Sequence, residues 1–130
     1  GGRIGVLVEV LCETDFVAKT EDFKIFAHEI SLQIAASTPK YVNREQVPAD
    51  EIAKEKEIYL EQAKSSGKPD QVIDKMVEGK IETYFAGICL LNQPYFRDPK
   101  KTVADLLNEI IAKTGEKITI SRFARLELSC

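Results

Sequence analysis

Hydrophobic and polar residues alternate at the amino-terminal end of the chain. The odd positions there include Arg3, Gly5 and Glu9. The even positions are all apolar and consist of Ile4, Val6, Val8, Val10 and Cys12. A period of two is typical of a strand that buries one face. The pattern therefore predicts a half-buried strand over residues 4–12.

The carboxyl-terminal end alternates in the same way over residues 117–128 and predicts a second long strand. Its apolar positions, taken as one face, are Ile118, Ile120, Ala124, Leu126 and Leu128. Arg122 interrupts this face and Phe123 falls on the other one, so we expect a β-bulge near Ser121.

Between the two strands the apolar period becomes that of a helix. The first helical set consists of Phe23, Phe26, Ala27, Ile30 and Ile34. It predicts a helix from about Glu21 to about Ala36, with Thr20 as its N-cap. A fourth helix begins after Thr102, which forms a capping box with Asp105, and ends at Gly115.

Two further helices lie between the first and the fourth. The second begins with Pro48 as its first residue and has only a narrow apolar stripe, formed by Ile52, Tyr59 and Ala63. Residues 65–69 contain the glycine and proline that separate the helices of an αα-hairpin. The third helix is more strongly amphipathic, and its Gly79 predicts a close approach by a neighbouring element.

The order of these elements predicts the fold class. Residues 88–91 form a short apolar run that we expect to be a small strand, followed by a loop over residues 92–101. The helices come in a block rather than alternating with strands, which favours α+β. We expect a small antiparallel sheet of about three strands with a layer of helices, including the αα-hairpin. A chain of 130 residues suits a single domain, residues 1–130.

Composition and charge restrict the partners. The 18 Lys and Arg residues and 21 Asp and Glu residues give a net charge of −3, and neither sign forms a long block. The basic surface typical of nucleic-acid binding is therefore missing, and we expect no direct contact with nucleic acid. No apolar run approaches the roughly 20 residues that span a bilayer, so we expect no membrane association. A soluble protein of the cytoplasm or of an organellar matrix is predicted.

The residues with chemical potential are few. The three cysteines, Cys12, Cys89 and Cys130, lie too far apart for a zinc or redox motif, and His28 is the single histidine. A nucleophilic pair of Cys12 and His28 is one interpretation. Cys12, however, lies on the apolar face of its strand, where a free cysteine behaves as a small hydrophobic residue. We therefore predict no catalytic residue, no metal site and no cofactor.

Residues 12–18 join the first strand to the first helix. Thr14 and Asp15 are turn-forming or helix-capping residues, and they place Phe16 at the corner. A phenylalanine at a strand end usually belongs to the core, which is the alternative interpretation. An acid and an aromatic at such a corner are also well placed to project from a rigid scaffold, and this is the interpretation we prefer.

Three segments of the chain resemble the translation elongation factor Ts family. They are Gly-Arg-Ile-Gly-Val-Leu-Val-Glu-Val at 2–10, Cys-Glu-Thr-Asp-Phe-Val-Ala at 12–18 and Arg-Phe-Ala-Arg-Leu-Glu-Leu at 122–128. Leu11 stands where members usually carry Asn. The resemblance implies a guanine nucleotide exchange factor for elongation factor Tu, the GTPase that delivers aminoacyl-tRNA during protein biosynthesis. The resemblance also implies that the protein is not an enzyme, because nucleotide exchange breaks no covalent bond.

The resemblance also assigns roles to residues. It implies that Thr14, Asp15, Phe16 and Val17 enter the GTPase domain beside the Mg²⁺ site of the bound nucleotide. On this hypothesis Phe16 displaces side chains that support the Mg²⁺ site, and Asp15 positions it by hydrogen bonding.

Other expectations concern assembly. Family members usually carry a small helical N-terminal domain, which we expect this core and dimerisation domain to lack. A single copy of the module predicts a two-fold homodimer through the free face of the terminal strands, with Cys130 near that end as a candidate intermolecular disulfide. Arg122 and Arg125 are candidates for secondary partner contacts. The alternative hypothesis is a dimerisation scaffold that binds elongation factor Tu but needs the N-terminal domain for exchange.

Overall fold

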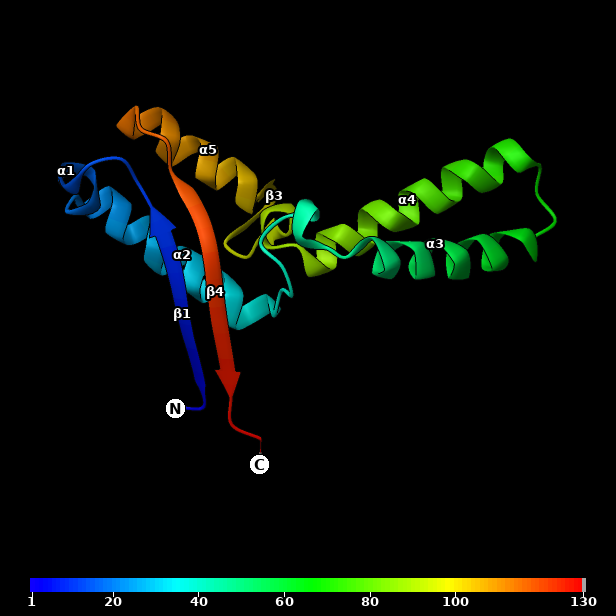
Figure 1. The fold of residues 1–130 in the computed structure, drawn as a ribbon, viewed down its shortest axis with the longest axis horizontal. Helices are drawn as coiled ribbons and strands as arrows, with labels where there is room; N and C mark the ends of the chain where they lie inside the picture. The colour runs from blue at the N-terminus through cyan, green and yellow to red at the C-terminus, as the bar shows by residue number, and fades with distance from the viewer. Residues whose placement is uncertain (130) are drawn as a thin grey trace.

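The computed structural model describes residues 1–129 and has the predicted α+β architecture (Figure 1). Cys130, with the disulfide predicted for it, lies outside the described residues. The helices and strands, with η for 3₁₀-helices, are in chain order β1 (Ile4–Leu11), α1 (Asp15–Ala18), α2 (Glu21–Ser37), η1 (Arg44–Gln46), α3 (Ala49–Lys64), α4 (Asp70–Ile88), η2 (Leu90–Asn92), β2 (Pro94–Tyr95), β3 (Asp98–Thr102), α5 (Val103–Thr114) and β4 (Thr119–Glu127).

Within residues 1–129 the strands form two antiparallel ribbons. We had expected about three strands in one sheet. The terminal strands β1 and β4 pair with each other, and β2 pairs with β3. Figure 1 shows β1 and β4 side by side in opposite directions, with the two ends of the chain at the same end of the ribbon. The pairing of the terminal strands therefore joins the two ends of the chain.

The predicted bulge at Ser121 is confirmed. Val10 pairs with Ile120 and Glu9 pairs with Arg122, which leaves Ser121 as an extra residue in β4. The face predicted for this strand is nevertheless wrong beyond the bulge. One extra residue shifts a period of two by one position and so exchanges the two faces. The residues that face the core are therefore Ile118 and Ile120 before the bulge, and Phe123 and Arg125 after it.

The main core lies between the inner face of the β1–β4 ribbon and helices α2 and α5. Its buried residues are Phe23, Phe26, Ile30, Ile34, Val42, Leu90, Val103, Ile110, Ile118 and Ile120. Thr20 caps α2 by accepting a hydrogen bond from the Phe23 amide at 3.3 Å. The capping box of α5 and its left-handed stop at Gly115 are confirmed. The predicted period and caps thus placed both helices correctly.

Helices α3 and α4 form the predicted αα-hairpin, which extends away from the body of the molecule (Figure 1). Pro48 and Pro69 are the N-cap residues of these helices rather than their first helical residues. Ala63 is the buried residue of α3. The close approach predicted at Gly79 is wrong, because no atom lies within 4 Å of the position that a Cβ there would occupy.

The short strand predicted at residues 88–91 is also wrong. Ile88 ends α4, Cys89 makes a single bridge to Tyr41, and Leu90 begins η2. Cys89 and Leu90 are fully buried where the hairpin joins the body, so their apolar character reflects burial rather than a strand period. The expected loop over residues 92–101 instead contains the β2–β3 ribbon.

Candidate functional site

The candidate site is the corner at which β1 ends and the single-turn helix α1 begins. Figure 1 shows α1 beyond the end of β1. Thr14 has an extended backbone and is the N-cap of α1, because its side chain accepts a hydrogen bond from the Val17 amide at 3.3 Å. Local sequence thus makes the turn: the hydroxyl of Thr14 satisfies a backbone donor that a helix start leaves free.

The two central residues of the corner, Asp15 and Phe16, face the solvent. Phe16 is 86% exposed, which excludes the interpretation of Phe16 as a core residue. Asp15 is exposed as well, whereas Val17 is partly buried against the main core. The motif therefore divides into an anchor, Val17, and a projecting acid and aromatic pair. Burial of the Phe16 side chain therefore contributes little to the stability of the fold, and its apolar surface is available to a partner.

The far side of the corner is joined to the start of α2. The Thr20 hydroxyl donates to the Val17 carbonyl at 2.7 Å, and the Thr20 amide donates to the same oxygen at 3.0 Å. The same hydroxyl accepts from the Phe23 amide and so caps α2. One threonine therefore closes α1 and opens α2, which limits the freedom of the residues between them.

The near side of the corner depends on Glu116, which sequence reasoning missed. One carboxylate oxygen of Glu116 accepts from the amides of Glu13 and Thr14 at 3.0 Å each. The other oxygen accepts from the Thr14 hydroxyl at 2.6 Å. These hydrogen bonds, that of the Thr14 hydroxyl first, lower the pKa of the Glu116 carboxyl below its ordinary value. The one sequence signal was an acid directly after the helix stop at Gly115, which does not identify its partner.

The two candidate arginines lie on opposite faces of the β1–β4 ribbon. The Arg122 side chain is 80% exposed on the outer face and forms an ion pair with Glu9 at 3.3 Å. The Arg125 side chain is only 13% exposed and donates to the Ala35 carbonyl at 3.0 Å. Arg125 therefore holds the ribbon to the end of α2, whereas Arg122 is accessible.

Cys12 and His28 do not form a nucleophilic pair. The Cys12 thiol donates to the Thr14 carbonyl at 3.3 Å, within the corner itself. Within residues 1–129 no group of three or more His, Cys, Asp or Glu side chains is arranged to hold a metal ion. None of the helices within residues 1–129 has both the length and the hydrophobicity of a transmembrane span.

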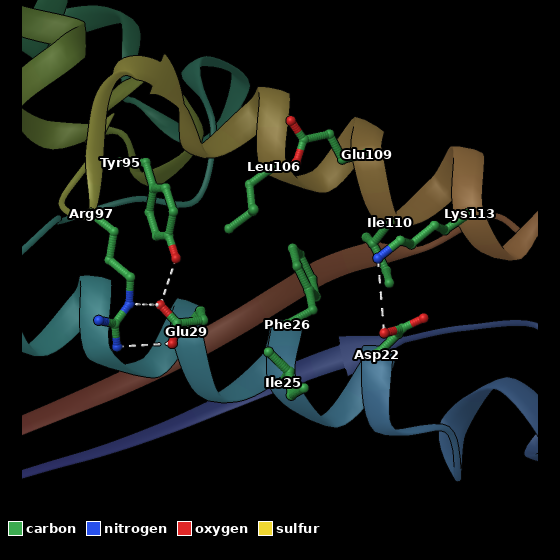
Figure 2. A pocket seen from close by; sticks show the side chains of 10 residues that line it. All are labelled: Asp22, Ile25, Phe26, Glu29, Tyr95, Arg97, Leu106, Glu109, Ile110 and Lys113. Atoms are coloured by element: carbon green, nitrogen blue, oxygen red, sulfur yellow. Dashed lines mark hydrogen bonds and ion pairs between the residues drawn. The ribbon is translucent and has the colours of Figure 1, made fainter.

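A pocket of about 280 Å³ lies elsewhere, between α2, α5 and the β2–β3 ribbon (Figure 2). Four of its charged side chains pair with another lining residue, whereas Glu109 pairs with Lys101 outside the pocket. Arg97 and the Tyr95 hydroxyl both donate to Glu29, and Lys113 lies 3.9 Å from Asp22. Burial raises the pKa of Tyr95 to about 12, and the Arg97 hydrogen bond lowers the pKa of Glu29. The motif residues 14–17 do not line this pocket.

Comparison with known proteins identifies the family of the chain. The family model of elongation factor Ts matches residues 1–129 of the chain. The chain belongs to the elongation factor Ts family. This confirms the resemblance inferred from the three sequence segments.

Two relatives in the elongation factor Ts family illustrate the extent of the match. The elongation factor Ts of Heliobacterium modesticaldum is 59% identical over 128 residues, which cover 98% of this chain and 60% of the relative. That of Caldanaerobacter subterraneus subsp. tengcongensis is 61% identical over 127 residues, covering 98% of this chain and 64% of the relative. The chain therefore spans about three fifths of the length of these elongation factors Ts.

Proposed function

We propose that the chain promotes release of GDP from elongation factor Tu by presenting the Asp15–Phe16 corner to the GTPase. Membership of the elongation factor Ts family supports the choice of partner. The observation that carries the proposal is the 86% exposure of Phe16 on a corner that is hydrogen-bonded on both sides.

The mechanism follows from linkage. A partner that prefers the nucleotide-free arrangement of a GTPase weakens nucleotide binding by the same factor by which the nucleotide weakens the partner. GDP and its Mg²⁺ hold the switch regions and phosphate loop in one arrangement. Insertion of Phe16 displaces side chains that support the Mg²⁺ site, and Asp15 orients the insertion by hydrogen bonding. No bond is broken, so no catalytic residue or cofactor is required.

The test is the release of fluorescent GDP from elongation factor Tu after addition of the chain. Phe16→Ala and Asp15→Ala are expected to slow release at a given concentration of the chain. Phe96→Ala is the matched control, because Phe96 is also exposed, at 39%, but lies in the turn between β2 and β3. Release at the wild-type rate by both corner variants contradicts the proposal.

The alternative function is a dimerisation scaffold, and the outer face of the β1–β4 ribbon favours it. Leu7 and Leu126 on this face are each 77% exposed, and Ala124 lies opposite Leu7. Exposed apolar side chains that adjoin one another mark an interface. A two-fold homodimer through this face buries them, as an isologous contact requires.

Light scattering tests the dimer, and capture of elongation factor Tu combined with GDP release distinguishes the two functions. Light scattering at micromolar concentration reports the dimer, and Leu7→Lys is expected to convert it to a monomer. Ile58→Lys, at an exposed apolar position on α3, is the control and is expected to leave the dimer intact. Capture of elongation factor Tu without GDP release favours the scaffold, and capture with release favours the exchange factor. A wild-type monomer refutes the dimer.

A further inference from the structure

The fold brings Glu116 to the candidate site through the antiparallel pairing of the terminal strands. Leu11 at the end of β1 lies opposite Thr119 at the start of β4. The segments just beyond these two residues therefore meet, although Glu13 and Glu116 are 103 positions apart in the sequence. The left-handed turn at Gly115, with a φ of 69°, ends α5 immediately before Glu116.

The contact between the two segments is reciprocal. Glu116 accepts from the amides of Glu13 and Thr14, and the Glu13 carboxylate accepts from the Lys117 amide at 2.9 Å. In each direction an acidic side chain binds backbone N–H groups of the other segment. Hydrogen bonds to a carboxylate are roughly twice as strong as those between neutral groups. We call this set of hydrogen bonds the Glu13–Glu116 bridge.

The bridge also sets the orientation of the Thr14 hydroxyl. A hydroxyl has one hydrogen to donate and lone pairs to accept. The Thr14 hydroxyl donates to Glu116 and accepts from the Val17 amide, so Glu116 directs its hydrogen away from α1 and leaves a lone pair for the cap. The N-cap of the motif helix thereby depends on a residue that follows α5.

We propose that Glu116 is a positioning residue of the exchange motif: through the Glu13–Glu116 bridge it holds Asp15 and Phe16 in the geometry that the partner binds. This inference rests on the proposed function, since it names the residue that preorganises the same corner. Preorganisation acts on the fraction of molecules that are competent to bind. A lower competent fraction raises the apparent dissociation constant in proportion and leaves the bound state unchanged.

The prediction is therefore a split between two kinetic quantities. Glu116→Ala is expected to raise the concentration of the chain that gives half-maximal GDP release by about tenfold, with the maximal rate unchanged. Glu116→Gln, which keeps one acceptor oxygen, is expected to give a smaller rise. Glu109→Gln is the matched control, because Glu109 is an exposed glutamate of α5 that pairs with Lys101 away from the corner.

A second measurement uses the free chain and needs no partner. Hydrogen exchange followed by NMR is expected to show faster exchange of the Glu13 and Thr14 amides in both Glu116 variants. The amide of Leu7 is the reference, because Leu7 and Ala124 form a hydrogen-bonded pair in the register set by the bond from the Leu128 amide to the Arg3 carbonyl, and it is expected to exchange at the wild-type rate. Faster exchange throughout the chain indicates a general loss of stability and overturns the positioning role.

The remaining outcomes are equally decisive. Unchanged protection of the Glu13 and Thr14 amides overturns the bridge. Lost protection with an unchanged half-maximal concentration, while Phe16→Ala is impaired, overturns the positioning role and leaves the proposed function intact. If Phe16→Ala releases GDP as the wild type does, the proposed function fails, and the positioning role fails with it. The amide measurement then still decides whether the bridge orders the corner.

Discussion

Replacement of Phe16 by alanine is expected to separate function from stability. Phe16 is 86% exposed, so folding removes only about one seventh of its side-chain surface from water. For a phenylalanine of roughly 200 Å² this is about 30 Å², or less than about 1 kcal/mol at ~25 cal/mol per Å². Phe16→Ala is therefore expected to lower the free energy of unfolding by no more than that.

The buried Phe26 of α2 provides the contrast. It is 4% exposed and belongs to the main core, so Phe26→Ala removes packing and leaves a cavity. The expected loss of unfolding free energy is about 3–5 kcal/mol. Phe26 does not belong to the corner, so the fraction of Phe26→Ala that remains folded is expected to release GDP as the wild type does.

The functional cost of Phe16→Ala follows from the surface that the partner covers. Complete burial of a large apolar side chain contributes about 1.5–3 kcal/mol. A loss of about 2 kcal/mol in the complex corresponds to roughly a 30-fold weaker effect on GDP release at subsaturating concentration.

The assay combines urea unfolding with fluorescent GDP release on the same preparations. A loss of more than about 2 kcal/mol in the unfolding free energy of Phe16→Ala refutes the solvent-exposed role of Phe16. Wild-type release by a stable Phe16→Ala variant refutes the insertion mechanism. The expected result is wild-type stability combined with slow release.

Three further predictions concern the stability of the fold. Arg125→Ala is expected to lower the free energy of unfolding by about 1–3 kcal/mol, because the Ala35 carbonyl loses its donor. Arg122→Ala is expected to change it by no more than about 0.5 kcal/mol, and urea unfolding measures the stability of both variants. A slower release of GDP by Arg122→Ala indicates that Arg122 contacts the partner. Deletion of Ser121 is expected to keep the inner and outer faces of β4 in place, because Ile120 and Arg122, which already pair with the adjacent Val10 and Glu9, become consecutive. A loss of more than about 2 kcal/mol in the free energy of unfolding by urea contradicts this. The raised pKa of Tyr95, about 12, predicts that stability falls as pH rises above about 10, because the unfolded chain loses the phenolic proton first. Burial also raises the pKa of Tyr84 to about 12, so in Tyr95→Phe the component of the alkaline absorbance titration near 12 is expected to fall in amplitude by one tyrosine; an unchanged amplitude contradicts the assignment.

Local signals in the sequence predicted much of the candidate site. A threonine followed by an acid at a strand end predicted the cap and the corner, because an N-cap hydrogen bond spans only three positions. The same locality explains the success at Thr20, Thr102 and Gly115. Each of these signals depends on atoms within one helical turn, so the residues next to one another in the sequence are enough to predict the cap.

Signals that depend on distant partners were missed. The Glu13–Glu116 bridge joins residues about one hundred positions apart, and nothing in either segment identifies the other. The strand expected at residues 88–91 failed for a related reason. A short apolar run records that residues are buried, and Cys89 and Leu90 are buried by the docking of the hairpin rather than in a sheet.

The sequence by itself determined the α+β class, the helical hairpin, the alternation of the terminal strands and the caps, because these follow from periodicity and local hydrogen bonding. It also identified the residues that resemble the elongation factor Ts family. Only the tertiary structure decided that Phe16 lies outside the core and that Arg122 and Arg125 face opposite ways. The physical reason is that one bulged residue and one antiparallel register determine which side chains meet the core and which meet water.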